Sequence, residues 1–148
     1  MRAILAGGLF AALMSCGDPG VPTSVPSELA LGTWGGDNAG VIVTDTATHV
    51  HIGCTFGDIK GRVSLDASGR FALDGTYVLR AYPIFIGPEL PAQFSGVVDG
   101  NRLTLAVAVN DTVSGKVVSL GPVSVTFGKT PDMGPCPICS ADRIGSRQ

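Results

Sequence analysis

The sequence has few of the residues that fill exposed helices. Its 148 residues include only two glutamates, three lysines and two glutamines, against 21 glycines and ten prolines. Glycine and proline weaken helices, whereas the three scarce residues favour them, so this balance excludes a helical bundle. Charged residues are also scarce, at 15%, but 45% of the chain is hydrophobic, which excludes a disordered protein. A chain of this length accommodates one domain.

Basic runs and catalytic motifs are missing as well. The formal net charge is −2, and lysine and arginine are scattered singly. Without a basic patch the chain has no electrostatic surface for nucleic acid, so we expect no nucleic-acid partner. The sequence has no G-x-S-x-G motif and no glycine loop that would cradle a phosphate. We therefore predict no catalytic residues, no enzymatic activity and no cofactor.

The N-terminal segment has the pattern of an export signal. Arg2 precedes a run of twelve apolar residues, 3–14, which Ser15 and Cys16 follow. This run is shorter than the roughly 20 apolar residues that a transmembrane helix requires. We therefore predict a secretory signal peptide over residues 1–15.

The junction after this run resembles the lipobox of bacterial lipoproteins. It reads Leu13-Met14-Ser15-Cys16, with a leucine at minus three, a small residue at minus one and then the cysteine. The resemblance implies that residues 1–15 are removed and that Cys16 carries diacylglycerol and an acylated amine, with palmitate among the acyl chains. The alternative is an ordinary signal peptide cleaved nearby, which leaves Cys16 as an unmodified thiol.

Such an anchor predicts a location in the cell envelope. Each buried methylene contributes about 0.8 kcal/mol, so two or three acyl chains hold a small domain on a membrane essentially permanently. In lipoproteins of the enterobacterial type, Asp directly after the lipidated cysteine favours the inner membrane, but Gly17 stands there in this chain. We therefore predict attachment to the outer membrane, facing the periplasm. Residues 16–28 contain the lipidated cysteine and an extended Pro/Gly-rich tether.

Residues 29–130 show the rhythm of an all-β domain, and residues 131–148 form a cysteine-bearing tail. Apolar and polar residues alternate, and Gly, Asp or Asn clusters interrupt the alternation every eight to twelve residues. We predict seven or eight antiparallel strands, two of which, Gln93 to Val98 and Asn101 to Val109, form a hairpin. Without a helix to cover a sheet, the strands must form a closed meander barrel or a sandwich. The other predicted strands are 31–34, 40–45, 48–56, 59–65, 70–80 and 117–128.

One short motif resembles a signature of calycin barrels, the lipocalin and avidin type. Gly32, Thr33 and Trp34 match the G-x-W sequence that opens the first strand of those barrels. The resemblance implies that Trp34 packs across one end of the barrel. It also implies an Arg or Lys from the last strand over the indole, a position that would fall to Lys129.

A wider set of motifs resembles small bacterial lipoproteins of uncharacterised function. The shared order is GTWGG, a cysteine, GRF, GTY, SG-x-V-x-G-x-x-LTL and a cysteine near the end. In this chain the motifs begin at Gly32 and end at Cys136, a span of about 100 residues. The resemblance implies the same barrel and brings no activity with it.

The cysteines after the lipobox predict a disulfide, because an exported protein reaches an oxidising compartment. In the predicted strand 48–56, Cys54 falls on the apolar face, and we predict that it pairs with Cys136 in the tail. Cys139 is then left over. The rival pair is Cys136 with Cys139, whose C-x-x-C spacing occurs in redox motifs, but this Pro/Gly-rich tail lacks the helix N-terminus that such activity requires.

Two histidines share the opposite face of the same predicted strand. His49 and His51 lie about 7 Å apart along an extended chain. Catalytic zinc takes three protein ligands and the chain has no further histidine, so a carboxylate such as Asp45 or Asp58 would have to complete a metal site. We predict solvent-facing histidines, with a metal site as the alternative.

An apolar, proline-rich segment at 81–91 interrupts the strand pattern. Proline denies a sheet its hydrogen-bond donor, so we predict a long loop over one end of the barrel. The loop either plugs the barrel as part of the core or presents an apolar rim to a ligand or partner. The residues of this rim are Tyr82, Ile84, Phe85 and Ile86.

Together these features predict a lipid-anchored envelope protein that is a non-catalytic binding or interaction module on a β-barrel scaffold. One alternative is a carrier of an apolar small molecule, motivated by the G-x-W strand and the apolar loop. The other is a periplasmic inhibitor of a lytic enzyme or protease, motivated by the anchor and the missing catalytic residues. The expected partners are the membrane, through the anchor, and a protein or an apolar small molecule.

Overall fold

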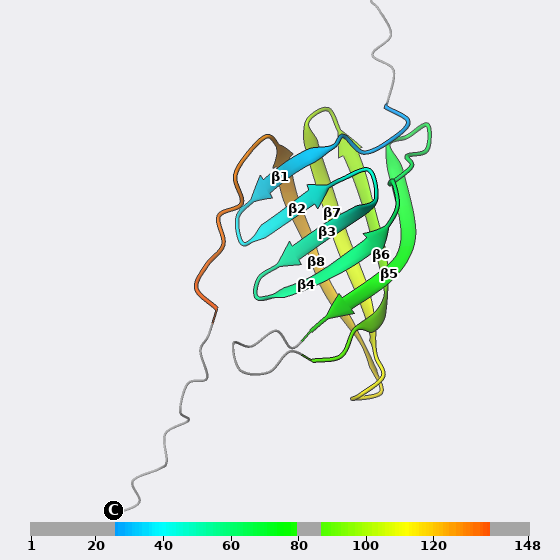
Figure 1. The fold of residues 1–148 in the computed structure, drawn as a ribbon, viewed down its shortest axis with the longest axis vertical. Helices are drawn as coiled ribbons and strands as arrows, with labels where there is room; N and C mark the ends of the chain where they lie inside the picture. The colour runs from blue at the N-terminus through cyan, green and yellow to red at the C-terminus, as the bar shows by residue number, and fades with distance from the viewer. Residues whose placement is uncertain (1–25, 80–86, 137–148) are drawn as a thin grey trace, which may run out of the picture.

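A computed structural model describes residues 26–79 and 87–136 of the chain (Figure 1). These residues contain no helix, and therefore none that could span a membrane. Eight strands form one closed antiparallel barrel. The strands are β1 (Gly32–Gly36), β2 (Ala39–Val43), β3 (Ala47–Ile52), β4 (Thr55–Lys60), β5 (Arg70–Val78), β6 (Leu90–Asp99), β7 (Arg102–Asp111) and β8 (Lys116–Phe127).

The barrel is a simple meander, in which each strand pairs with the next one along the chain. It closes where β1 pairs with β8, with Trp34 opposite Phe127 and Gly35 opposite Thr126. In Figure 1, β1–β4 lie on the near side and β6–β8 run behind them. The predicted all-β barrel is thus confirmed, and the sandwich alternative is wrong, because closure pairs the two strands that a sandwich would leave as edges.

The alternation of the strands places one continuous core inside the barrel. Leu103, Leu105, Val107 and Val109 of β7 are at most 1% exposed, as their spacing predicts. Trp34, Tyr77 and Phe94 are the largest fully buried side chains, and the buried residues of the described chain form one hydrophobic cluster. The interior of the barrel is therefore occupied by the protein's own side chains.

The predicted strand 48–56 is wrong, because the structure contains a hairpin there. β3 ends at Ile52, β4 begins at Thr55, and Ile52 pairs with Thr55 across a two-residue loop. Gly53 has φ +59°, so it fits the first position of a type II′ turn, where the chain reverses between twisted strands. Cys54 is therefore a half-buried turn residue and not a core residue on a strand face.

The predicted strand 59–65 also differs from the structure. β4 ends at Lys60, because Gly61 has φ +78°, which a regular strand does not allow. Ser64 then makes an isolated bridge to Glu28, near the point where the described chain begins.

The C-terminal segment 129–136, here called the strap, returns across the outer side of β1 and β2. The amide of Asn38 donates to the carbonyl of Asp132 at 2.7 Å, and the amide of Asp132 donates to the carbonyl of Gly36 at 2.9 Å. Gly35 makes this path possible, because a β-carbon at that position would overlap with the backbone of Lys129. The predicted tail 131–148 is thus fixed to the barrel as far as residue 136.

Candidate functional site

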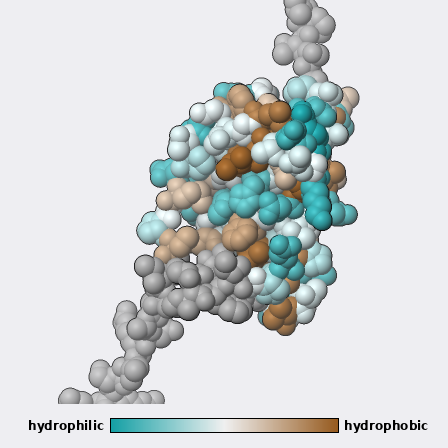
Figure 2. Space-filling view, viewed as in Figure 1, coloured by the Kyte–Doolittle hydropathy of each residue, from teal (hydrophilic) through white to brown (hydrophobic). Residues whose placement is uncertain are grey.

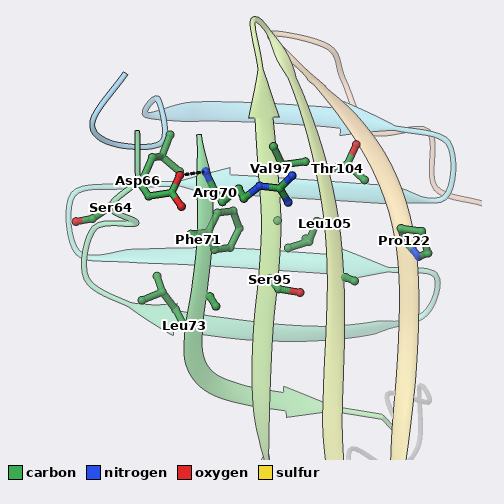
Figure 3. Close-up of a pocket in the computed structure, with 14 residues that line it drawn as sticks. Ser64, Asp66, Arg70, Phe71, Leu73, Ser95, Val97, Thr104, Leu105 and Pro122 are labelled. Carbon is green, nitrogen blue, oxygen red and sulfur yellow. Dashed lines mark hydrogen bonds between the residues drawn. The ribbon is translucent and has the colours of Figure 1, made fainter. Parts of the chain in front are cut away.

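Surface hollows, rather than the packed interior, are the candidate sites. One is an open groove of about 700 Å³ on the outer side of β5–β7 (Figure 3). Its floor is formed by small outward residues, among them Ala72, Ser95 and Ala106. At one end, the backbone amide of Arg70 donates to Asp66 Oδ1 at 2.9 Å. The residues that line this groove include no histidine and no cysteine.

A smaller groove of about 150 Å³ lies between β2, β3 and the strap. We call it the strap groove. Figure 2 shows the same side of the molecule as Figure 1, where hydrophilic side chains over β3 adjoin hydrophobic ones over β2. The residues that line the strap groove are Gly40, Ile42, His49, His51, Pro131 and Met133.

The register of the sheet explains why these residues meet. Gly40 pairs with His51 and Ile42 pairs with His49, so all four alternate to the outside of the barrel. A β-carbon at Gly40 would lie 2.7 Å from Cγ of Pro131, so only glycine lets the strap pack this closely on β2. Pro131 and Met133 then form the second wall of the groove.

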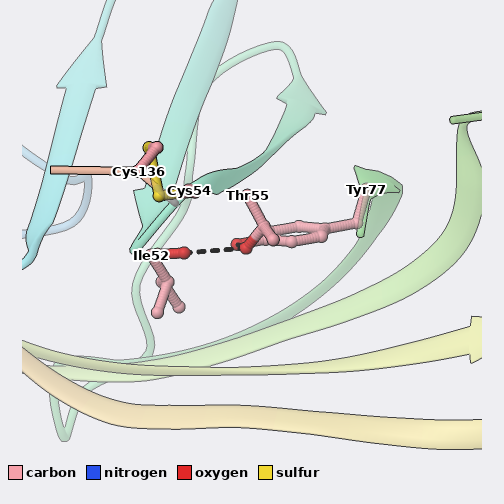
Figure 4. The surroundings of a disulfide bond; sticks show 5 residues. All are labelled: Ile52, Cys54, Thr55, Tyr77 and Cys136. Atoms are coloured by element: carbon pink, nitrogen blue, oxygen red, sulfur yellow. Dashed lines mark hydrogen bonds between the residues drawn. A yellow bond between two sulfur atoms is a disulfide. The ribbon is translucent and has the colours of Figure 1, made fainter. Parts of the chain in front are cut away.

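A disulfide fixes the far end of the strap. Cys54, in the β3–β4 turn, and Cys136 are joined with an S–S distance of 2.14 Å and a Cα–Cα distance of 5.4 Å (Figure 4). The predicted pairing of these two cysteines is confirmed. The link joins positions 82 residues apart and holds the strap against the hairpin that carries the two histidines.

A short hydrogen-bonded chain supports the same turn. The hydroxyl of Thr55 donates to the carbonyl of Ile52 at 2.7 Å and lies 2.9 Å from the hydroxyl of Tyr77. Since the single proton of Thr55 is used by Ile52, Tyr77 is the donor to Thr55. Burial raises the pKa of Tyr77.

The two histidines differ in their hydrogen bonding. His49 Nδ1 lies 2.7 Å from Asp58 Oδ1 on the neighbouring strand β4. An ionised carboxylate only accepts, so Nδ1 of His49 carries a proton, and in the neutral ring the lone pair is then on Nε2. From the sequence, Asp45 and Asp58 are carboxylates that could complete a metal site with the histidines, and the structure pairs Asp58 with His49.

The rings of the cluster lie against one another. The ring centroids of His49 and His51 are 4.8 Å apart, and the ring of Phe56 lies 5.7 Å from the first and 5.5 Å from the second. Partial burial lowers the pKa of His51, the neighbouring His49 lowers it further, and Asp58 opposes both effects. His51 therefore favours the neutral form, in which a ring nitrogen is available as an acceptor or ligand.

The structure also places the residues of the G-x-W motif. Trp34 is 2% exposed, its Nε1 donates to the carbonyl of Ala30 at 3.1 Å, and its ring packs edge-on against Phe127 at 5.1 Å. Gly32, with φ +129°, opens β1. The expected cation over the indole is not found among the described residues, where Lys129 is exposed and Phe127 takes the ring contact.

Several predicted residues lie outside the described parts of the chain. They are Cys16, Tyr82, Ile84, Phe85, Ile86 and Cys139. Sequence reasoning missed Met133 as a member of the strap groove and Phe56 as the ring that packs against both histidines. No sequence spacing links Met133 to histidines more than 80 residues earlier, and only the strap brings them together.

Comparisons with protein-family models, with curated proteins and with solved structures find no match. The candidate site is therefore supported by its geometry.

Proposed function

We propose that this protein is a lipid-anchored module of the bacterial cell envelope that binds without catalysis, and that its binding surface is the strap groove. The observation that carries the proposal is the contrast between the two sides of the barrel wall. Inward residues form one hydrophobic cluster, whereas the strap groove gathers imidazole and apolar side chains on the outside. Binding sites combine an apolar wall with a few fixed polar groups, and this groove has both.

The anchor and the tether complete the proposal. The lipobox at Cys16 would hold the chain on a membrane, and the tether would let the barrel stand away from it. A protein fixed in this way gains from a surface site, because a ligand reaches it without passing into the barrel.

The carrier alternative requires a barrel that accepts an apolar molecule inside, and the packed core argues against it. The inhibitor alternative requires a protein partner on the outside, which the strap groove does not exclude. The loop residue Phe85 is the place to test that alternative, through capture of a partner by the wild type and by Phe85→Asp.

Denaturing extraction of the purified full chain, followed by mass spectrometry, tests the proposal. We expect no stoichiometric apolar compound from the wild type. A Phe94→Ala variant is the positive control, because deleting a ring that is 0% exposed opens an apolar cavity in the core. An apolar compound recovered reproducibly from the wild type at one equivalent would overturn the proposal in favour of the carrier.

A further inference from the structure

The strap groove brings together two kinds of metal ligand that are far apart in the sequence. His49 and His51 provide imidazole nitrogens from β3, and Met133 provides a thioether from the strap. The described residues contain no group of three His, Cys, Asp or Glu side chains that could hold a metal ion. A metal in this groove would therefore need a thioether as its third ligand.

We infer that the strap groove is a site for monovalent copper, with His49, His51 and Met133 as its ligands. This inference rests on the proposed function and names the ligand of its binding surface. Thioether sulfur is a soft ligand that favours Cu(I), and imidazole also suits copper. Zinc takes four ligands, and Cu(II) prefers square-planar nitrogen and oxygen ligands, whereas Cu(I) is stable at low coordination numbers.

The geometry of the two imidazoles fits a shared ion. Imidazole nitrogen binds a first-row metal such as zinc at about 2.0–2.1 Å. When two rings share an ion, the two ligating nitrogens therefore lie roughly 4 Å apart or less. The ring centroids of His49 and His51 are 4.8 Å apart, which is close enough for one nitrogen of each ring to reach a common ion. Met133 has three rotatable side-chain bonds, which let its sulfur approach the pair from the opposite wall.

Asp58 prepares His49 for this role. Its carboxylate holds Nδ1–H of His49 at 2.7 Å, which leaves Nε2 as the ligand atom and fixes the direction of the ring. Carboxylates behind ligating histidines commonly act in this way. The negative charge of Asp58 also offsets the charge of a bound Cu(I), and Phe56 shields the two rings from water on one side.

The proposed site requires the strap to stay on the barrel, and the disulfide holds it there. Met133 lies between two fixed points of the strap. On one side, two residues earlier, Pro131 packs on Gly40, and on the other side, three residues later, Cys136 is joined to Cys54. With the strap held at both points, the thioether stays beside the imidazoles. Asp58 and the disulfide are thus positioning elements, and the three ligands are the binding residues.

Titration of the purified full chain with Cu(I), under anaerobic conditions and against a chromophoric Cu(I) chelator, tests the inference. A free thiol would itself bind Cu(I), so every protein in the series carries Cys139→Ser and keeps the Cys54–Cys136 disulfide. We expect uptake of one equivalent, with sulfur and nitrogen scattering in the X-ray absorption spectrum of the bound copper.

Variants of the exposed residues identify the ligands without disturbing the core. Met133→Leu is expected to lower the Cu(I) affinity at least about tenfold, and Asp58→Asn to lower it by about 10–100-fold. Val113→Ala, at an exposed position in the β7–β8 turn and outside the strap groove, is the control and leaves the affinity unchanged.

Three results would overturn the inference. The first is failure of the wild type to take Cu(I) from the chelator. The second is a Cu(I) affinity that neither Met133→Leu nor Asp58→Asn alters. The third is tighter binding of zinc than of Cu(I) with no effect of Met133→Leu. None of these results depends on the extraction experiment, so failure of the copper site and failure of the proposed function are separate outcomes.

Discussion

At the scale of single residues, two glycines decide where the strap runs. Gly35 and Gly40 face outward on β1 and β2, and the strap occupies the space that their side chains would fill. In the sequence these glycines could be interpreted only as strand interruptions, because the chain segment that covers them lies about 90 residues further on. Their role is close backbone approach, which a β-carbon would prevent.

Substituting Gly35 tests this role. Gly35→Ala places a methyl group in overlap with the carbonyl of Lys129, so we expect a loss of about 1–3 kcal/mol in the free energy of unfolding, measured by urea denaturation. Gly134→Ala is the matched control, since the atom nearest to a β-carbon there is Asn38 Oδ1, at 3.7 Å. The control should change stability by less than about 0.5 kcal/mol. Equal stability of the two variants would show that the strap does not lie on Gly35.

Tyr77 gives the barrel a pH dependence above neutrality. Burial raises its pKa above the ordinary value of 10.0, so the folded state holds the phenolic proton more tightly than the unfolded chain does. This contribution to stability is complete below pH 10 and is lost as the pH rises through the folded-state pKa. Ultraviolet titration of the phenolate should therefore show one tyrosine ionising above the normal range.

The Tyr77→Phe variant provides the comparison. It should lose the late-ionising component and show a shallower fall in stability at alkaline pH. The chain has two tyrosines, and ionisation of both near pH 10 in the folded wild type would contradict the burial of Tyr77 beside Thr55.

At the scale of elements, the sequence predicts strands well where alternation and turn residues agree. β7 follows its alternating leucines and valines, and the turn at Asp99 and Gly100 ends β6 at the expected place. The β3–β4 hairpin was missed because the alternation continues through Gly53, and one glycine does not distinguish a turn from a bulge. The strap was missed because its contacts are made by backbone groups, which leave no periodic pattern.

The disulfide is the element-scale feature that the sequence did predict, although the prediction placed Cys54 on a strand face and the structure places it in the β3–β4 turn. Closing a loop between residues 82 apart stabilises the folded state by up to about 4–5 kcal/mol in the chain-entropy description. We expect a Cys54→Ser/Cys136→Ser double variant to lose stability in urea denaturation within that limit, while Cys139→Ser is unchanged. Peptide mapping of the non-reduced protein should recover Cys54 linked to Cys136, and a Cys136–Cys139 linked peptide would refute this pairing.

At the scale of the whole molecule, the closed barrel and the proposed membrane anchor would separate binding from attachment. Closure leaves the described barrel without a free sheet edge, and the core fills its interior. The remaining candidate surfaces are on the outside. The barrel class could be predicted from the strand rhythm, but the strap groove could not, because it depends on a contact between β3 and a segment beyond β8.

The anchor predicts a simple fractionation result. Cys16→Ser removes the acyl acceptor, so the full-length chain should move from the membrane fraction to the soluble fraction of the envelope when cells are separated by centrifugation. Cys139→Ser should remain with the membranes. Retention of both variants on the membrane would show that Cys16 carries no lipid that anchors the protein.

The central claim is that binding occurs in the strap groove, outside a filled barrel. Amide chemical-shift mapping of the full chain carrying Cys139→Ser, before and after one equivalent of Cu(I), tests this claim most directly. The account predicts shifts confined to β2, β3, the facing part of β4 and residues 129–136. Shifts centred on inward residues such as Phe94, or shifts centred on the groove over β5–β7, would contradict it, and no shifts at all would contradict the copper site.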